Sequence, residues 1–288
     1  MANTPGAVTA NGANVTLTET STTVTLSNGI VSILCSKTGG NITQINYTFN
    51  NTGSSQTLNL LSGGNNGGQL YWEHSNNQGL SFTYSIVTNP TANGGDYAEI
   101  ALSTVTQANM PMEVHYSMLR GSSGFYVTPI FIHSSSNDAF GMGECRDNIY
   151  AGSIFNWMSV DATRNKLMPV TGGNTTTCPT SPVENYLWTS GIYQGRYEDK
   201  YKYSATFGDQ RVWGWSSVTT TTPAFTGKNV GLWNVLASAE FYNGGPLKPE
   251  LMSHMGTTIL NMINGGHYGM GSDGTFVAGE VWSKVCGP

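Results

Sequence analysis

The sequence predicts an all-β protein, folded as a large antiparallel β-sandwich, and three features of the chain favour this fold class. Charged residues make up only 10% of the 288 residues, and Asn, Thr, Ser and 36 glycines supply the polarity instead. Thr and the 14 tyrosines suit pleated strands, whereas Gly and Asn suit tight turns. Short alternating segments follow one another along the chain, and no long stretch has apolar residues at helical spacing. A chain of this length can also bury a substantial core.

The first half of the chain reads as a succession of short strands separated by turn residues. Residues 15–26 alternate up to the turn residues Asn28-Gly29, and residues 30–35 follow as a second strand. An Asn-Gly pair between alternating segments is typical of a tight turn, so we expect a hairpin here. Residues 62–68 are all Ser, Gly or Asn and predict a loop. The further strands that the alternation predicts are 42–49, 70–72, 80–87, 98–106, 112–119 and 125–133.

The second half continues this pattern of strands and turns. Residues 230–236 predict a buried strand, and residues 257–263 predict another. The segments 172–182 and 238–249 are rich in turn residues and read as connections. Because no linker or change of composition interrupts the chain, we expect residues 1–288 to form a single domain.

Composition argues against several classes of partner. The formal net charge of −5 argues against a nucleic-acid-binding protein, because contact with phosphates needs a basic surface. No run of about 18 apolar residues is present, so we expect no membrane-spanning segment. Polar, weakly charged chains rich in Asn and Thr are typical of secreted proteins, and we expect an extracellular monomer. The N-terminal residues include no apolar segment, so a signal peptide either was removed from this sequence or never preceded it.

Four cysteines are present: Cys35, Cys145, Cys178 and Cys286. If all four are bridged, three pairings are possible, and the sequence does not choose among them. Their spacing matches no zinc-binding template, so we expect neither a metal site nor another cofactor.

The segment 196–215 stands out because it holds four of the 12 Lys and Arg residues of the chain. Residues 196–205 alternate, and a strand there carries Lys200 and Lys202 on one face and tyrosines on the other. A polar strand face with two lysines is commonly a solvated surface. The alternative is the floor of a groove that binds a polyanion, in which one lysine acts as a base. The pattern alone leaves both interpretations open.

Four segments of the second half carry a resemblance to a known family. They are G-E-C-R at 143–146 with F-N-W-M-S-V-D-A-T-R-N-K-L-M-P at 155–169, D-K-Y-K-Y-S and R-V-W-G-W within 199–215, A-E-F-Y-N-G-G-P-L-K at 239–248, and G-H-Y-G at 266–269. The segment T-V-T-L-S-N-G-I-V at 23–31 also matches the start of that family's catalytic domain. On these motifs the chain resembles the rhamnogalacturonan lyases of the rhamnogalacturonase B type, polysaccharide lyase family 4.

The resemblance implies a galactose-mutarotase-like β super-sandwich, which agrees with the all-β prediction from composition. It covers essentially the whole chain, but only the first part of the family's usual length. Members of the family continue into a fibronectin-III-like domain and a carbohydrate-binding domain, and neither is in this sequence. We therefore expect a truncated chain that holds the catalytic domain.

The resemblance also implies a β-elimination that cleaves rhamnogalacturonan I, a pectin in which rhamnose alternates with galacturonate. The bond at O4 of galacturonate breaks after a base removes the C5 proton, which lies α to a carboxylate. Arg146 suits the neutralisation of that carboxylate, because a guanidinium binds it with two parallel hydrogen bonds. The other interpretation of Arg146 is a structural ion pair with Glu144 or Asp147.

Two further positions match catalytic residues of the family. Lys200 is the candidate base and must be neutral to act, so neighbouring cations or burial have to lower its pKa. Lys202 lies on the same face and is the competing base, or otherwise a substrate contact. His267 matches the catalytic histidine and is the candidate acid, although a histidine in a Gly-rich strand end is commonly incidental.

The expected sugar contacts are Lys202, Tyr201, Tyr203, Arg196 and Tyr268. The tyrosines can stack on sugar rings or donate hydrogen bonds, but the alternation also allows them to lie in the core. Residues 259–262, where some family members have tyrosines, are Ile-Leu-Asn-Met here. No cluster of carboxylates lies near these segments, so we expect no Ca²⁺.

Two other classes of function stay open. The same aromatic and cationic residues fit a β-sandwich that binds pectin or another polysaccharide without cleaving it. A sugar epimerase of the mutarotase type needs a His/Glu pair, for which the options are His254 with Glu240 or His267 with Glu280. Formation of an unsaturated uronate from rhamnogalacturonan separates the lyase from both.

Overall fold

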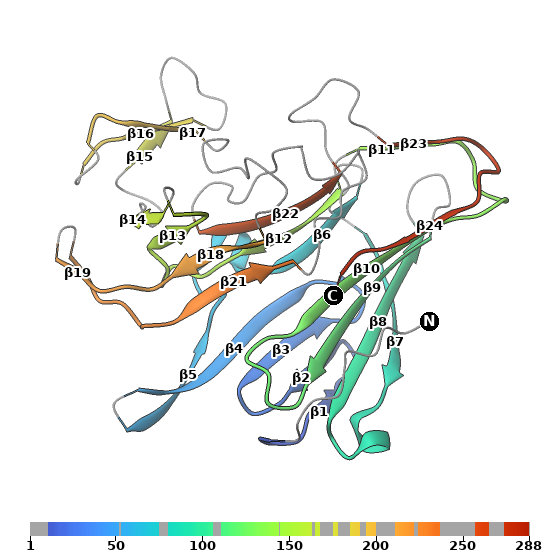
Figure 1. Cartoon of the computed structure of the whole chain (residues 1–288), viewed down its shortest axis with the longest axis horizontal. Helices are drawn as coiled ribbons and strands as arrows, with labels where there is room; N and C mark the ends of the chain where they lie inside the picture. The colour runs from blue at the N-terminus through green and yellow to red at the C-terminus, as the bar shows by residue number, and fades with distance from the viewer. Residues whose placement is uncertain are drawn as a thin grey trace. The chain divides into compact units, whose positions relative to one another are not determined.

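In the computed structural model, the regular elements of the described residues are β-strands that pair antiparallel and are joined by turns and loops (Figure 1). The structure describes residues 11–51, 53–74, 80–105, 111–143, 145–162, 165–167, 175–177, 185–190, 194–199, 211–221, 224–236, 257–264 and 274–287. Among these residues the only helical elements are two short 3₁₀ turns, η1 (Asn65–Gly67) and η2 (Pro90–Asn93). The all-β prediction is therefore confirmed. In the described ranges no helix has the length and apolar character needed to cross a lipid bilayer.

The chain divides into two compact units, each made of segments that are distant in the sequence. The first unit consists of residues 1–60, 70–145 and 273–288, and the second of residues 61–69 and 146–272. No single linker separates them, because the chain enters and leaves the second unit more than once. The single domain expected for the whole chain stays a prediction.

One sheet of the first unit has the strand order β1-β2-β3-β4-β6, and β5 pairs with β4. Its strands are β1 (Thr16–Glu19), β2 (Thr23–Ser27), β3 (Val31–Ser36), β4 (Ile42–Asn51), β5 (Ser54–Asn59) and β6 (Leu70–His74). Buried and half-exposed residues alternate along β2 and β3, so Val24, Leu26 and Ile33 face the core together. The strands predicted at 42–49 and 70–72 correspond to β4 and β6.

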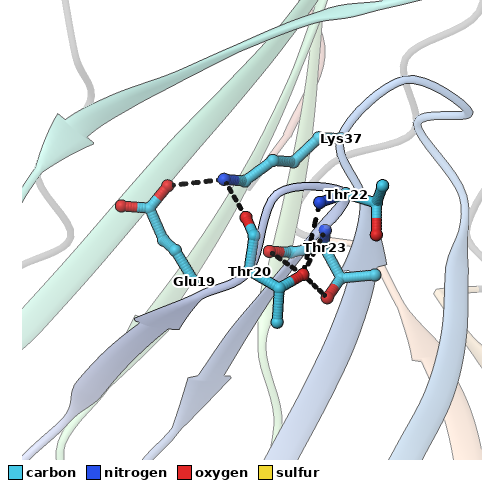
Figure 2. A network of polar contacts seen from close by, with 5 residues as sticks. All are labelled: Glu19, Thr20, Thr22, Thr23 and Lys37. Carbon is cyan, nitrogen blue, oxygen red and sulfur yellow. Dashed lines mark hydrogen bonds and ion pairs between the residues drawn. The ribbon is translucent and has the colours of Figure 1, made fainter.

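The single strand expected over residues 15–26 is wrong, because the chain turns between β1 and β2 (Figure 2). The Thr20 hydroxyl lies 2.7 Å from the Thr23 hydroxyl and accepts the Thr23 backbone N–H at 3.0 Å. Lys37 donates to the Thr20 carbonyl at 2.7 Å and pairs with the Glu19 carboxylate at 2.8 Å. The hydrogen bond from Lys37 lowers the pKa of Glu19. The turn residues are Thr and Ser like those of the strands, so the sequence pattern does not reveal the turn.

The hairpin expected at Asn28-Gly29 joins β2 to β3 and is confirmed. Gly29 has a φ of +83°, a backbone conformation that favours glycine. The buried Asn28 side chain holds the turn, because its Oδ1 accepts the Val31 N–H at 2.9 Å. Its Nδ2 donates to the Leu119 carbonyl at 2.8 Å, which ties the hairpin to the second sheet of the same unit.

This second sheet has the order β24-β10-β9-β8-β7. Its strands are β7 (Thr83–Thr88), β8 (Tyr97–Val105), β9 (Pro111–Leu119), β10 (Tyr126–His133) and β24 (Trp282–Val285). The strands predicted at 80–87, 98–106, 112–119 and 125–133 are confirmed as β7 to β10, with shifted boundaries. The core face of the sheet carries Ile100, Leu102, Val114 and Phe131, which are at most 1% exposed.

The opposite face of this sheet holds a polar network. Glu99, only 4% exposed, accepts the Tyr97 hydroxyl at 2.7 Å and lies 2.6 Å from Nδ1 of His115. The other ring nitrogen of His115, Nε2, lies 3.2 Å from the Glu113 carboxylate. Burial and the adjacent Glu99 carboxylate raise the pKa of Tyr97. The buried carboxylate thus has two side-chain partners within its own sheet.

His133, the last residue of β10, is buried between two backbone carbonyls. Its Nδ1 lies 2.6 Å from the Glu280 carbonyl, and its Nε2 lies 3.0 Å from the Asp138 carbonyl. A carbonyl oxygen only accepts, so these contacts favour the doubly protonated ring and raise the pKa of His133. The ring stacks on Phe276 of β23 (Gly274–Phe276), a strand that pairs with β11 (Phe140–Met142).

Cys35, Cys145 and Cys286 are buried thiols rather than halves of disulfides, so the bridging of all four cysteines is not found. Cys178 lies outside the described residues. Burial raises the pKa of the Cys35 thiol to about 12, which keeps it protonated at neutral pH.

The second unit contains several smaller sheets. In addition, β12 (Cys145–Tyr150), which belongs to this unit from Arg146 on, neighbours β22 (Thr258–Asn264). A four-stranded sheet has the order β14-β13-β18-β21, with β13 (Trp157–Ser159), β14 (Asn165–Leu167), β18 (Val212–Ser216) and β21 (Gly231–Val235). The remaining strands are β15 (Thr175–Thr177), β16 (Asn185–Trp188) and β17 (Tyr197–Asp199) in one sheet, and the pair β19 (Thr220–Thr221) and β20 (Ala224–Phe225).

Trp215 of β18 lies at the centre of this unit's core. It is 1% exposed, and its Nε1 donates to the Thr258 carbonyl at 3.0 Å, which ties β18 to β22. Met158 of β13, opposite Trp215 in the register, is equally buried. A Trp N–H that finds a partner lets the large ring be buried without an unpaired donor.

The two strands predicted in this part of the chain have different outcomes. The strand predicted at 257–263 is confirmed as β22, and the strand predicted at 230–236 is confirmed as β21. The expected burial of β21 is wrong, because Trp233 is 41% and Val235 is 65% exposed. Apolar composition does not distinguish a covered strand from one whose apolar face is open.

Candidate active site

Arg146 occupies the second position of β12 and is only 8% exposed. The residues of β12 from Cys145 to Ile149 are all buried, so both faces of the strand are covered. Successive side chains of a strand point to opposite faces, which places Arg146 on the face opposite to Asp147. An ion pair between these two neighbours is therefore disfavoured. Glu144, the other partner considered for Arg146, lies outside the described residues.

Two contacts fix how β12 lies against β22. The Ala151 N–H donates to the Thr257 carbonyl at 2.8 Å, and the Asn261 side chain is hydrogen-bonded to the Asp147 carboxyl. Asp147 precedes Ala151 by as many residues as Asn261 follows Thr257, so the two strands run antiparallel. The end of β22 therefore lies beside the start of β12, where Arg146 is placed.

His267 follows the end of β22 at Asn264 by three residues and lies outside the described residues. β22 thus runs toward the end of β12 at which Arg146 lies. The pairing of Arg146 with His267 in one site stays a prediction.

Asp147 is a buried acid whose surroundings disfavour its charged form. It is 5% exposed, and among the described residues its Oδ1 is a buried oxygen without a hydrogen-bond partner. Burial raises the pKa of Asp147 from 3.8 to about 7, although the hydrogen bond from Asn261 opposes this change. Below about pH 6, Asp147 therefore adds little negative charge beside Arg146.

Arg196 is exposed and directly precedes β17. Its carbonyl accepts the Trp188 N–H at 3.0 Å, so its backbone is anchored to β16 while its side chain reaches the surface. The strand expected over 196–205 begins as β17, which pairs with β16 through Glu198 opposite Tyr186. Lys200 follows the last residue of β17 in the sequence.

The other predicted site residues lie outside the described part of the chain. They are Lys200, Tyr201, Lys202, Tyr203, His267 and Tyr268. Arg146 and Arg196 belong to different sheets of the second unit, and their meeting in one groove stays a prediction. Within the described ranges, no group of three His, Cys, Asp or Glu side chains is arranged to hold a metal ion.

The sequence analysis missed two tryptophans that share one face of the four-stranded sheet. Trp157 lies opposite Ser216, and Ser216 lies opposite Gly231, so these three residues form a row across β13, β18 and β21. Trp233 follows Gly231 by two residues and lies on the same face. We call the face that carries Trp157, Ser216, Gly231 and Trp233 the tryptophan face. A glycine two residues before an exposed tryptophan is the sequence signal that could have found it.

Comparison with known proteins connects these features to one family. Residues 1–181 match the model of the "Rhamnogalacturonate lyase family". The matched region includes Arg146 and Trp157 and ends before Arg196.

Two relatives carry the similarity further along the chain. A rhamnogalacturonate lyase of Dickeya dadantii (strain 3937) is 26% identical over 196 residues, which cover 67% of this chain and 30% of the relative. A probable rhamnogalacturonate lyase C of Emericella nidulans is 25% identical over 276 residues, which cover 92% of this chain and 26% of the relative. The chain thus spans less than a third of the length of either relative.

Proposed function

Because the chain belongs to the rhamnogalacturonate lyase family, we propose that it cleaves rhamnogalacturonan I by β-elimination. The bond that breaks joins C4 of galacturonate to O4, the oxygen that links it to rhamnose, and the product carries a 4,5-unsaturated galacturonate at its new end. The observation that carries this proposal is Arg146, an enclosed guanidinium whose neighbour Asp147 points to the other face of the strand and has a pKa that burial raises to about 7. Such a cation suits the carboxylate of galacturonate.

Arg146 acts on the acidity of the reacting carbon. The C5 proton of galacturonate is α to the carboxylate, and removing it places negative charge on that group. Two parallel hydrogen bonds from a guanidinium stabilise the growing charge more than they stabilise the ground state. Enclosure of Arg146 strengthens this effect, because little water competes for the guanidinium.

Lys200 is the proposed base. Its neutral amine takes the C5 proton, the electron pair of that C–H bond forms the C4=C5 double bond, and the C4–O4 bond breaks. The departing O4 stays on rhamnose and receives a proton from His267 or from water. Arg196 and Lys202 are close in sequence and supply the positive charge that favours the neutral amine of Lys200.

The remaining residues of the site contact the substrate. Tyr201, Tyr203 and Tyr268 are proposed to stack on sugar rings or to donate to hydroxyls, and Arg196 and Lys202 to bind further galacturonates. The exposed position of Arg196 supports this role, because an exposed cation reaches a polyanion without rearrangement.

At the level of the whole chain, we propose a galactose-mutarotase-like β super-sandwich that acts as an extracellular monomer without a cofactor. The all-β architecture and the membership in the family support the fold. The low content of charged residues supports an extracellular protein.

The direct test is incubation with rhamnogalacturonan I while the absorbance of the unsaturated uronate is followed. We expect product from rhamnogalacturonan and none from polygalacturonate, which lacks the rhamnose leaving group. Binding of rhamnogalacturonan without any absorbing product would instead favour a polysaccharide-binding protein.

Arg146→Lys sharpens this test. A point charge replaces the two-pronged guanidinium, so we expect turnover to fall by about 100-fold or more. The matched control is Arg120→Lys in the first unit, where Arg120 pairs with Asp96 at 3.0 Å, and it should retain turnover. Wild-type turnover in Arg146→Lys would make Arg146 a structural residue.

A further inference from the structure

The tryptophan face is an open surface of the second unit with a defined floor. A row of three residues, Trp157, Ser216 and Gly231, crosses three neighbouring strands in register. Neighbouring strands lie about 4.8 Å apart, so Trp157 and Gly231 are separated by roughly 10 Å. Between them the floor consists of Ser216 and Gly214, which have small side chains or none.

The N–H edge of the Trp233 indole points at Gly231. A Cβ built on Gly231 would clash with Nε1 of Trp233 and would lie 3.3 Å from its Cδ1 and Cε2 atoms. These distances place the Cβ beside the N–H edge and close to the ring plane, so the glycine leaves the space that this edge occupies. Trp233 is 41% exposed, so part of its ring surface is open to solvent.

Trp157 is held in place from its edge. Its Nε1 donates to Oδ1 of Asn165, and the same oxygen accepts the Ser159 hydroxyl at 2.9 Å. The indole N–H is thereby satisfied within the sheet, and the half-buried ring keeps its apolar surface for another partner. Both rings are oriented before anything binds, which lowers the entropic cost of binding.

The described residues of this face carry no formal charge. In addition to the residues named above, they are Leu167, Val212 and Val235. Val212 and Val235 are opposite each other beside Trp233, and both are exposed. An uncharged surface of flat rings, hydroxyls and exposed methyl groups is complementary to a neutral sugar and not to a uronate.

We propose that the tryptophan face binds the rhamnose residues of the rhamnogalacturonan backbone, an inference that rests on the proposed function. The rings of Trp157 and Trp233 lie on strands two positions apart in the sheet, and this spacing suits contact with every second sugar of an extended chain. In an alternating polymer, every second sugar is of one kind, so both rings meet rhamnose. The C6 methyl of rhamnose gives it an apolar edge that packs against Val212 and Val235 beside Trp233. The galacturonate between the two rhamnoses passes over Ser216.

The test measures binding of rhamnogalacturonan oligosaccharides by calorimetry for the wild type and for Trp233→Ala, Trp157→Ala and Gly231→Ala. Each tryptophan change should weaken binding about three- to tenfold, because one ring contact is lost. Gly231→Ala keeps both rings but pushes the Trp233 indole off the sheet, and it should weaken binding in the same range. Phe49→Ala, which removes a half-exposed aromatic ring of β4 in the first unit, is the matched control and should bind like the wild type.

Polygalacturonate oligosaccharides, which contain no rhamnose, test whether the loss of binding is specific to rhamnose. Their binding should be unchanged in all three variants, because the tryptophan face contributes only to rhamnose. In the lyase assay the variants should raise KM by the same factor and leave kcat unchanged at saturation. Circular dichroism and the denaturation midpoint identify any variant that fails to fold, and Gly231→Ala then carries the test.

The outcomes separate this inference from the proposed function. Cleavage with unchanged rhamnogalacturonan affinity in all variants would overturn the tryptophan face and leave the lyase intact. Rhamnose-dependent binding without cleavage would support the face and overturn the lyase. If the tryptophan variants change the sedimentation coefficient of the protein but not sugar binding, the face is an interface between copies of the chain and the inference is wrong.

Discussion

Glu99 in the first unit and Asp147 in the second are buried to almost the same extent, at 4% and 5% exposed, but their surroundings differ. Glu99 accepts the Tyr97 hydroxyl and lies against the His115 ring, so its carboxylate has partners on the same face of its sheet. Asp147 has the Asn261 amide, and its buried Oδ1 has no hydrogen-bond partner. The environment of Asp147 favours its neutral form, because burial raises its pKa.

His133 shows that the first unit treats a buried base in the same way as Glu99. Two carbonyls accept from its ring and favour the charged form. Glu99 and His133 of the first unit thus each have two hydrogen-bond partners inside that unit, which stabilises the fold. The second unit contains an enclosed guanidinium, a buried acid whose pKa burial raises, and an exposed aromatic face. Arg146, Arg196, Lys200 and His267, which the proposed function uses, all belong to the second unit.

Among the variants that test this comparison, we expect Lys200→Ala in the second unit to have the largest effect on turnover. Removing the base should lower turnover by about 10²–10⁴-fold with little change in the denaturation midpoint. Lys202→Ala is the matched control and should affect KM more than kcat. Equal losses of kcat would mean that both lysines act through their charge, and the reverse order would move the base to Lys202.

Asp147→Asn tests the neutral acid through the pH dependence of stability. The pKa of Asp147 rises from 3.8 to about 7 on folding, so its contribution to the free energy of unfolding falls as pH rises from about 4 to about 7. Asn cannot ionise. The free energy of unfolding of the variant should therefore rise by a few kcal/mol relative to that of the wild type between these pH values, since one pKa unit corresponds to about 1.4 kcal/mol.

The measurement is urea denaturation of both proteins at pH 4, 6 and 8. The difference at pH 4, where Asp147 is protonated in the folded state, serves as the internal control. A constant difference at all three pH values would show that Asp147 is charged when buried, and the contrast with Glu99 would disappear.

Glu99→Gln tests the charged acid of the first unit. An amide keeps the size of the side chain but removes the charge that Tyr97 and His115 bind, so we expect a loss of about 1–3 kcal/mol in the free energy of unfolding. Glu113→Gln, which changes the more exposed acid on the same histidine, should cost less than about 1 kcal/mol. Both variants should keep wild-type turnover, and a loss of turnover would place this network in the catalytic machinery.

The smallest effect is expected from Glu19→Gln, at the exposed turn between β1 and β2. Lys37 keeps its hydrogen bond to the Thr20 carbonyl when Glu19 loses its charge, so the turn retains its main contact. We expect no measurable change in the denaturation midpoint, whether at low or high salt. A clear loss at low salt would show that the ion pair, and not the Thr20 contacts, holds the turn.

Local pattern was sufficient to predict most strands of the first unit and the Asn28-Gly29 hairpin. It failed between β1 and β2 because Thr20 makes its turn through hydroxyl contacts, and Thr is equally at home in a strand. It failed again at Trp233, because burial depends on which elements cover a strand and not on the strand's own composition.

The candidate site was only partly accessible from sequence. The motif around Arg146 identified a residue that the fold does enclose. The orientation of Asp147 away from Arg146 follows from the position of both residues in one strand and could have been predicted by alternation. The raised pKa of Asp147 could not, because it depends on the burial of β12 and on Asn261, which is more than 100 positions away in the sequence.

The alkylation rates of the three buried cysteines report local unfolding of the protein. Cys35 in β3, Cys145 at the start of β12 and Cys286 after β24 belong to different strand segments, and all three are buried. A thiol reacts as its thiolate and only when it is exposed, so alkylation of each cysteine waits for its own strand to open. The three labelling rates, read by mass spectrometry in native buffer, therefore rank the opening free energies of these strands without any substitution.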